Sequence, residues 1–226
     1  MLNQQGHWQR ICLQLNQQLS KQVKLFIACA ILFLFATPAL AHHPLGGRLP
    51  SNFFEGIMSG FGHPILGFDH LAFVIASGLI AVGIARGILI PIAFVIATAI
   101  GAGIHLLSID LPIPEIVIAA SVVLFGVLLF TRKNQKLAIS YTLTTGLAAL
   151  AGIFHGHAYG EGIFGAEPTP LFAYLIGFTI IQLAISLGVY LVTNKVIRTI
   201  SLGLVTRFAG LAIAATGMVF LSSAIS

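Results

Sequence analysis

Histidine and aspartate side chains occur at metal-ligand spacing in an otherwise apolar chain. His63 is followed by Asp69 and His70 in the run HPILGFDH of residues 63–70. Imidazole is the usual nitrogen ligand for nickel, cobalt, copper and zinc, and carboxylates complete such sites. Hydrophobic residues make up 58% of the chain and charged residues only 8%, so ionisable groups beside apolar runs are candidates for function. The motif therefore predicts a site for a divalent transition-metal ion.

The local chain around this motif decides whether its side chains can share an ion. In a continuous helix His63 and His70 stand about 10 Å apart along the axis, too far for joint coordination. Pro64 and Gly67 permit a break in the helix, which would let the side chains converge. Asp69 is then either a ligand or an acceptor that holds one imidazole tautomer. The alternative is that Asp69 only caps a helix.

A second motif, FHGHAYGE at residues 154–161, adds three groups with metal affinity, His155, His157 and Glu161. The two histidines diverge by about 200° on a helix, so joint coordination requires a non-helical turn. Gly156 and Gly160 are predicted to end the helix there and to bring the backbone close to a neighbour. The alternative is a glycine-rich loop with solvated histidines.

Other polar groups are weaker candidates. His105 follows small residues in the run GAGIH of residues 101–105, which permit close helix contact. It is either a hydrogen-bond partner in helix packing or a further metal ligand. Tyr174 and Gln182 could line a path through the protein or bridge helices, and the sequence does not decide between these roles.

Apolar segments of membrane-spanning length set the fold class. Lipid offers no partner to exposed backbone groups, so each segment must be helical. The sequence predicts an all-α fold, a polytopic membrane bundle of six transmembrane helices in a single membrane domain, residues 42–226. The predicted segments are 65–85, 88–107, 113–130, 137–154, 171–193 and 202–222.

A cleavable signal peptide is predicted at residues 1–41. Lys21 and Lys24 precede a short apolar core, residues 25–35, and small residues occupy positions 39 and 41. The alternative is an uncleaved first transmembrane helix. Cleavage would remove both cysteines, so sulfur chemistry is excluded from the mature protein. It would also remove three of the eleven basic residues, so the net charge of +5 is no evidence for nucleic-acid binding.

Loop charges predict the orientation in the membrane. A signal peptide leaves the mature N-terminus outside, and the loops that should then face the cytoplasm carry the basic residues, as the positive-inside rule requires. These residues are Arg86, Arg132, Lys133, Lys136, Lys195 and Arg198. The opposite loops contain Asp110, Glu115, Glu161 and Glu167. Every histidine beyond the leader falls on the outer side, where the cluster would collect a cation. The expected location is the bacterial inner (plasma) membrane or the thylakoid.

Together the two motifs resemble those of the HupE/UreJ family of nickel and cobalt secondary permeases. The family signature H-x5-D-H is matched by His63, Asp69 and His70. A second signature, F-H-G-x-A-H-G-x-E, is matched at Phe154, His155, Gly156, Ala158 and Gly160 and departs at Tyr159, where the usual histidine is missing. The resemblance implies import of Ni²⁺ or Co²⁺, and the variant second motif looks like that of cyanobacterial members, which gives cobalt about equal weight with nickel.

The resulting hypothesis is a transporter and not an enzyme. Capture is assigned to His63, Asp69 and His70, with transfer through His155 aided by His157, Glu161 or His105. The expected partners are the transported metal ion and the lipid bilayer, with no nucleic acid, no nucleotide and no permanent cofactor; a homo-oligomer is left open. No nucleotide-binding P-loop is found in the sequence. Two alternatives use the same histidines, namely an intramembrane zinc hydrolase and a membrane protein that binds haem through two histidines.

Overall fold

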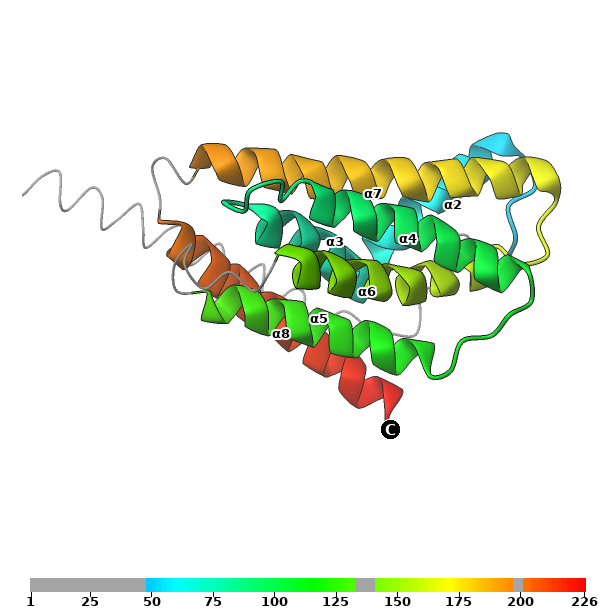
Figure 1. Ribbon diagram of the computed structural model, residues 1–226. Helices are drawn as coiled ribbons and strands as arrows, with labels where there is room; N and C mark the ends of the chain where they lie inside the picture. Colours follow the sequence, from blue (N-terminus) through cyan, green and yellow to red (C-terminus); the bar gives the residue numbers. More distant parts are fainter. Residues whose placement is uncertain (1–47, 133–140, 197–200) are drawn as a thin grey trace, which may run out of the picture. The chain divides into compact units, whose positions relative to one another are not determined.

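Seven α-helices make up the part of the chain that the computed structural model describes, residues 48–132, 141–196 and 201–226 (Figure 1). These residues lie within one folding unit, residues 37–226, and none of them is in a strand. The all-α fold is confirmed. The predicted signal peptide, residues 1–41, lies outside the described residues, as do Lys133, Lys136 and Arg198 of the predicted inner loops.

Four helices are long and apolar enough to cross a membrane, and each agrees with a predicted segment to within one helical turn. They are α4 (Leu89–Leu106), α5 (Pro114–Thr131), α7 (Pro168–Val196) and α8 (Leu202–Ala224). A chain with several such helices is a multi-pass membrane protein.

The first predicted span is broken, as the proline and glycine of its motif indicated. Helix α2 (Phe53–Leu66) ends at Gly67, and α3 (Phe68–Ala81) continues at an angle of 79°. Gly67 has an extended backbone, and its N–H donates to the carbonyl of His63 at 3.0 Å. A side chain at this position would meet the His70 ring at 2.6 Å. The break therefore brings the two ends of the first motif close together.

Helix α6 (Tyr141–Glu161) corrects one prediction about the second motif and confirms another. It runs through Gly156 and Gly160, so these glycines do not end the helix. They pack against α4 instead, because a Cβ at Gly160 would lie 2.7 Å from Cβ of His105, and one at Gly156 would collide with the carbonyl oxygen of Thr98. The expected close approach of the backbone to a neighbour, helix α4, is confirmed.

The expected number of six spans is not reached by length and hydropathy. Helices α2 and α3 make up at most one span, and the four apolar helices bring the total to five. Helix α6 is long enough but carries too many polar residues to meet the same test, although it packs among the other helices. Its polarity comes from the histidine motif itself, together with threonines in its first two turns.

The helices pack in close pairs: α4 with α6, α5 with α8 and α2 with α7 (Figure 1). Helix α3 contacts α7, α5, α8 and α4 and so lies among the pairs. Phe73 of α3 is fully buried, and its ring lies 4.8 Å from that of Phe94 in α4 and 4.6 Å from that of Phe125 in α5. This aromatic contact holds α3, and with it the second half of the first motif, against two neighbouring helices.

Arg132 closes the end of α3 opposite the motif. Its guanidinium donates to the carbonyl of Ile80 at 3.1 Å and to that of Val82 at 2.5 Å. Ile80 lies in the last turn of α3 and Val82 is its C-cap residue, where backbone acceptors have no partner within the helix. Partial burial lowers the pKa of Arg132 from its ordinary value. One of the basic residues predicted for the inner loops thus also fixes the position of a helix.

Candidate metal site

The five histidines of the described residues gather around the C-terminal half of α6 in two clusters. The buried cluster contains His63 of α2, His70 of α3 and His155 of α6, with Tyr159 and Tyr174 beside them. The loop cluster contains His105, Asp110 and His157. Because α6 stays helical, His155 and His157 point in different directions and belong to different clusters.

The buried cluster is closed to solvent. His63, His70 and His155 are all fully buried. The ring centroids of His63 and His70 lie 5.6 Å apart, and those of His70 and His155 lie 4.9 Å apart. The Tyr159 ring packs against the first two, at 5.0 Å from His63 and 4.7 Å from His70. Residues from α2, α3 and α6 therefore meet at one point. The bend at residue 67 allows His63 and His70, the two ends of the first motif, both to reach it.

Hydrogen bonds to Tyr174 determine the tautomer of His63. The Tyr174 hydroxyl donates its single hydrogen to the carbonyl of Tyr159 at 3.0 Å. Nδ1 of His63 lies 2.6 Å from the same hydroxyl oxygen; with the hydroxyl hydrogen on the Tyr159 carbonyl, this oxygen accepts from Nδ1, which then carries the proton. In the neutral ring, Nε2 of His63 then bears the electron pair that a metal ion requires.

The same reasoning applies to His70 and His155 through a serine. Ser121 of α5 donates its hydroxyl hydrogen to the carbonyl of Ile118 at 2.7 Å, so it accepts from Nε2 of His155 at 3.2 Å. Nδ1 of His155 then has an electron pair, and Nδ1 of His70, 2.7 Å away, donates to it. Nε2 of His70 carries no proton in the neutral ring. Two separate hydrogen-bond chains thus prepare His63 and His70 as donors of an Nε2 electron pair.

Asp69 and Tyr159 complete the polar surroundings of the buried cluster. Oδ1 of Asp69 accepts a hydrogen bond from the backbone N–H of His70 at 2.9 Å, in the first turn of α3, and the residue is buried. The Tyr159 hydroxyl is buried and has no hydrogen-bond partner among the described residues. A buried polar atom without a partner usually marks a place where a ligand, an ion or water belongs.

The structure does not bring the three side chains of the first motif together as one set of ligands. Among the described residues, one group of three His, Cys, Asp or Glu residues has ligand atoms that all lie within 4.8 Å of one another, and it is the loop cluster. The buried cluster therefore offers imidazoles and an adjacent carboxylate, not a closed cage.

The loop cluster joins the end of α4 to α6. Nδ1 of His105 lies 3.2 Å from Nε2 of His157 and 4.0 Å from Oδ1 of Asp110. Glu161 lies one turn after His157 on α6, with its carboxylate 3.4 Å from Nδ1. His157 is buried, His105 is half-buried and Asp110 is exposed. The candidates His105, His157 and Glu161 are thus neighbours in space.

Two members of these clusters could not be identified as such from the sequence. Asp110 lies in the loop after α4, and its only signal was its acidic character five residues after His105. Ser121 gave no signal at all, because a lone serine in an apolar helix is common. Tyr174 and Gln182 are both buried and bridge helices: Tyr174 joins α7 to α2 and α6, and Gln182 donates to Thr98 of α4 at 3.3 Å.

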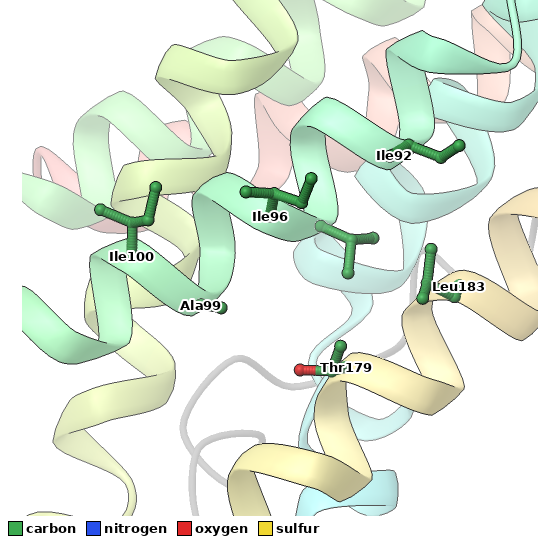
Figure 2. Close-up of a pocket in the computed structure, with 7 residues that line it drawn as sticks. Ile92, Ile96, Ala99, Ile100, Thr179 and Leu183 are labelled. Atoms are coloured by element: carbon green, nitrogen blue, oxygen red, sulfur yellow. The ribbon is translucent and has the colours of Figure 1, made fainter.

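A groove between α4 and α7 is apolar and separate in character from both clusters. It has a volume of about 590 Å³. Figure 2 shows aliphatic side chains of α4 and Leu183 of α7 around it, with the Thr179 hydroxyl as the polar group in view. Among the described residues no histidine or carboxylate lines it, so its surface is suited to hydrocarbon and not to a cation.

Comparison with known proteins identifies a family and a relative that the chain resembles. The HupE / UreJ protein family model matches residues 30–220. Protein HupE of Rhizobium leguminosarum bv. viciae is 32% identical over 127 residues, which are 55% of this chain and 62% of that protein. The match thus spans less than two thirds of the relative's length. No solved structure matches the chain.

Proposed function

The chain belongs to the HupE/UreJ family, and from this premise we propose that it imports a divalent transition-metal ion, Ni²⁺ or Co²⁺, across a bacterial membrane. The cargo is bound transiently by the buried cluster. His63 and His70 supply the electron pairs, and His155 orients His70 from the opposite side.

The observation that carries this proposal is the state of the two imidazoles. Each is buried, and Nδ1 of each lies within hydrogen-bond distance of a partner, the Tyr174 hydroxyl for His63 and Nδ1 of His155 for His70, which accepts in the arrangement derived above. Metal-binding histidines in proteins are oriented in this way by the group at their other ring nitrogen. Borderline dications such as Ni²⁺ and Co²⁺ prefer imidazole, whereas Mg²⁺ and Ca²⁺ prefer oxygen.

The incomplete ligand set suits transport. A site that passes an ion on must bind it with moderate strength. The buried cluster provides two prepared imidazoles, with the carboxylate of Asp69 nearby to offset the charge of a dication. The Tyr159 ring lies beside His63 and His70, and its hydroxyl has no hydrogen-bond partner among the described residues. This hydroxyl can serve as a weak oxygen donor to the ion or bind a water molecule that the ion carries.

The membrane potential is sufficient to drive uptake. A dication that moves into a negative interior gains about 4.6 kcal/mol per 100 mV, since each elementary charge gains about 2.3 kcal/mol. This energy supports an accumulation of about 2,000-fold at a tenfold change per 1.36 kcal/mol. Import therefore needs no nucleotide hydrolysis by this chain.

The test is initial uptake of radioactive Ni²⁺ and Co²⁺ by cells that produce each variant at equal membrane levels. We expect His70→Ala and Asp69→Asn to lower uptake at least tenfold. Glu115→Gln is the matched control for Asp69→Asn, because both acids lie in the first turn of a helix, and Glu115 is exposed and outside both clusters. Uptake by His70→Ala at the rate of the unmodified protein would show that the buried cluster does not carry the cargo. Competition of each metal against the other determines which is preferred.

A further inference from the structure

The loop cluster has the composition of a second metal site. It combines two imidazoles from different helices, His105 of α4 and His157 of α6, with the carboxylate of Asp110 from the loop between α4 and α5. This set is distinct from the buried cluster, with which it shares no side chain. Exposed Asp110 gives it contact with solvent, while His157 reaches it from inside the protein.

The distances fit one shared ion. Ligands bound at about 2.1 Å are separated by about 3.0 Å at adjacent octahedral positions and by about 3.4 Å at tetrahedral positions. The two ring nitrogens of His105 and His157 lie 3.2 Å apart. The carbonyl oxygen of Ile109 lies 3.3 Å from Nε2 of His157 and is a fourth donor at suitable distance. Oδ1 of Asp110 is 4.0 Å from His105 and reaches the position by a small side-chain movement.

The loop that carries Asp110 has a strained backbone and is hydrogen-bonded to His157. Ser108 has φ of 59° and Ile113 has φ of 47°, which are left-handed values that a β-branched residue such as isoleucine rarely adopts. Between them, the backbone N–H of Leu111 donates to Nε2 of His157 at 3.2 Å. Strain of this kind persists when the surrounding structure requires it, and it is concentrated at ligand sites.

The donor state of His157 is also prepared. Leu111 N–H donates to Nε2 in the tautomer that carries the proton on Nδ1, and this is the tautomer that can bind a metal ion; in the other tautomer Nε2 donates to the Ile109 carbonyl 3.3 Å away. The carboxylate of Glu161, 3.4 Å from Nδ1, favours that arrangement. Carboxylates commonly support metal-binding histidines from this side. A bound dication would take the place of the Leu111 N–H at Nε2.

We propose that His105, Asp110 and His157 form a second metal site that binds a divalent transition-metal ion from solution. Because two of its ligands are imidazoles, the site prefers Co²⁺, Ni²⁺ or Zn²⁺ to Mg²⁺ and Ca²⁺. The binding rests on the geometry of the loop cluster alone. The further step, that the transported ion binds here before it reaches the buried cluster, rests on the proposed function. His157 of this site lies two residues along α6 from His155 of the buried cluster.

The test uses purified full-length protein in detergent, with the buried cluster disabled by His70→Ala. Binding of Co²⁺ is followed by its visible absorption and by equilibrium dialysis. We expect His70→Ala to retain one Co²⁺ per chain, and addition of Asp110→Asn to weaken its affinity at least tenfold. Asp110 is exposed, so its replacement does not disturb folding. Addition of Glu115→Gln, the next acid along the chain, should leave Co²⁺ affinity unchanged.

Two outcomes would overturn the second site: His70→Ala protein that binds no Co²⁺, or equal Co²⁺ affinity with and without Asp110→Asn. The outcomes also separate this inference from the proposed function. Cells that take up no metal while the purified protein keeps the Asp110-dependent Co²⁺ would refute transport and support the site. Uptake that depends on His70, together with an absent second Co²⁺, would refute the site and support transport.

Discussion

Replacement of Tyr174 by phenylalanine isolates the role of the hydrogen bonds in the buried cluster. The hydroxyl of Tyr174 accepts from Nδ1 of His63 at 2.6 Å and donates to the carbonyl of Tyr159 at 3.0 Å. Tyr174→Phe removes both bonds but keeps the ring, which packs 5.7 Å from the ring of Phe178. The substitution therefore changes the hydrogen bonding around His63 with little change in packing.

Two effects of different size follow. Loss of the hydrogen-bond partner of a buried polar group lowers the free energy of unfolding by about 1–3 kcal/mol. Tyr174→Phe removes the hydroxyl that is hydrogen-bonded to Nδ1 of His63. The proton of His63 is then no longer held at Nδ1, and a proton on Nε2 blocks the electron pair. Loss of such a supporting partner typically lowers metal affinity or activity about 10- to 100-fold. We therefore expect a loss of about 10- to 100-fold in Co²⁺ affinity at the buried cluster, and in uptake.

Co²⁺ affinity is best measured in an Asp110→Asn background, in which the loop cluster binds Co²⁺ more weakly. Tyr190→Phe is the matched control, because Tyr190 lies half-buried on the same helix and outside the cluster. Thermal unfolding, measured in parallel, separates a loss of stability from a loss of affinity. If Tyr174→Phe lowers stability while Co²⁺ affinity stays within twofold, the tautomer of His63 does not control metal binding, and the reasoning fails.

Three further substitutions test the packing and the ligand number. Gly152→Ala, whose Cβ would lie 2.5 Å from a backbone oxygen of α4, should lower the free energy of unfolding by about 1–3 kcal/mol. Gly146→Ala is the control on the same helix, because a Cβ there has no atom within 4 Å, and it should raise the free energy of unfolding by up to about 1 kcal/mol. Equal shifts of the unfolding temperature in both variants would contradict close packing at Gly152. Arg132→Gln should lower the free energy of unfolding by about 1.5–3 kcal/mol, because charged hydrogen bonds to the end of α3 are lost. Arg86→Gln should have little effect, and equal losses in both variants would show that Arg132 does not stabilise the end of α3. Tyr159→His should add a fourth imidazole to the buried cluster, next to His63 and His70. It should raise Co²⁺ affinity about tenfold or more and slow uptake, and faster uptake would argue against a requirement for moderate affinity.

Much of the fold could be predicted because its determinants are local. Apolar length alone located α4, α5, α7 and α8, since lipid leaves a helix as the only suitable backbone. The break at Gly67 was also predictable from the proline and glycine within the first motif. The helix before that break was not predicted, because α2 begins at Phe53 in a polar context. Its N-terminus is set by Asn52, which accepts from the N–H of Glu55, and by the ion pair of Glu55 with Arg48.

The course of α6 could not be predicted from local rules. Glycine favours the end of a helix when only the local chain is considered. In the folded protein, Gly156 and Gly160 face α4, and side chains there would collide with its backbone or with His105. The close contact between helices outweighs the local preference, and the helix continues to Glu161. For this reason the histidines of the second motif could be recognised as candidates but could not be assigned to separate clusters.

Helix α6 explains how so polar a segment is accommodated in a membrane protein. Every residue from His155 to Gly160 is buried, so the polar side chains face other helices and not lipid. The period of 3.6 residues turns His155 toward α3 and α5, while His157 turns toward α4 and its loop. Gly156 and Gly160 allow α4 to approach closely enough for His105 to meet His157. A side chain at position 160 would push His105 away, so the same residues that pack α6 also determine whether the loop cluster can close around an ion.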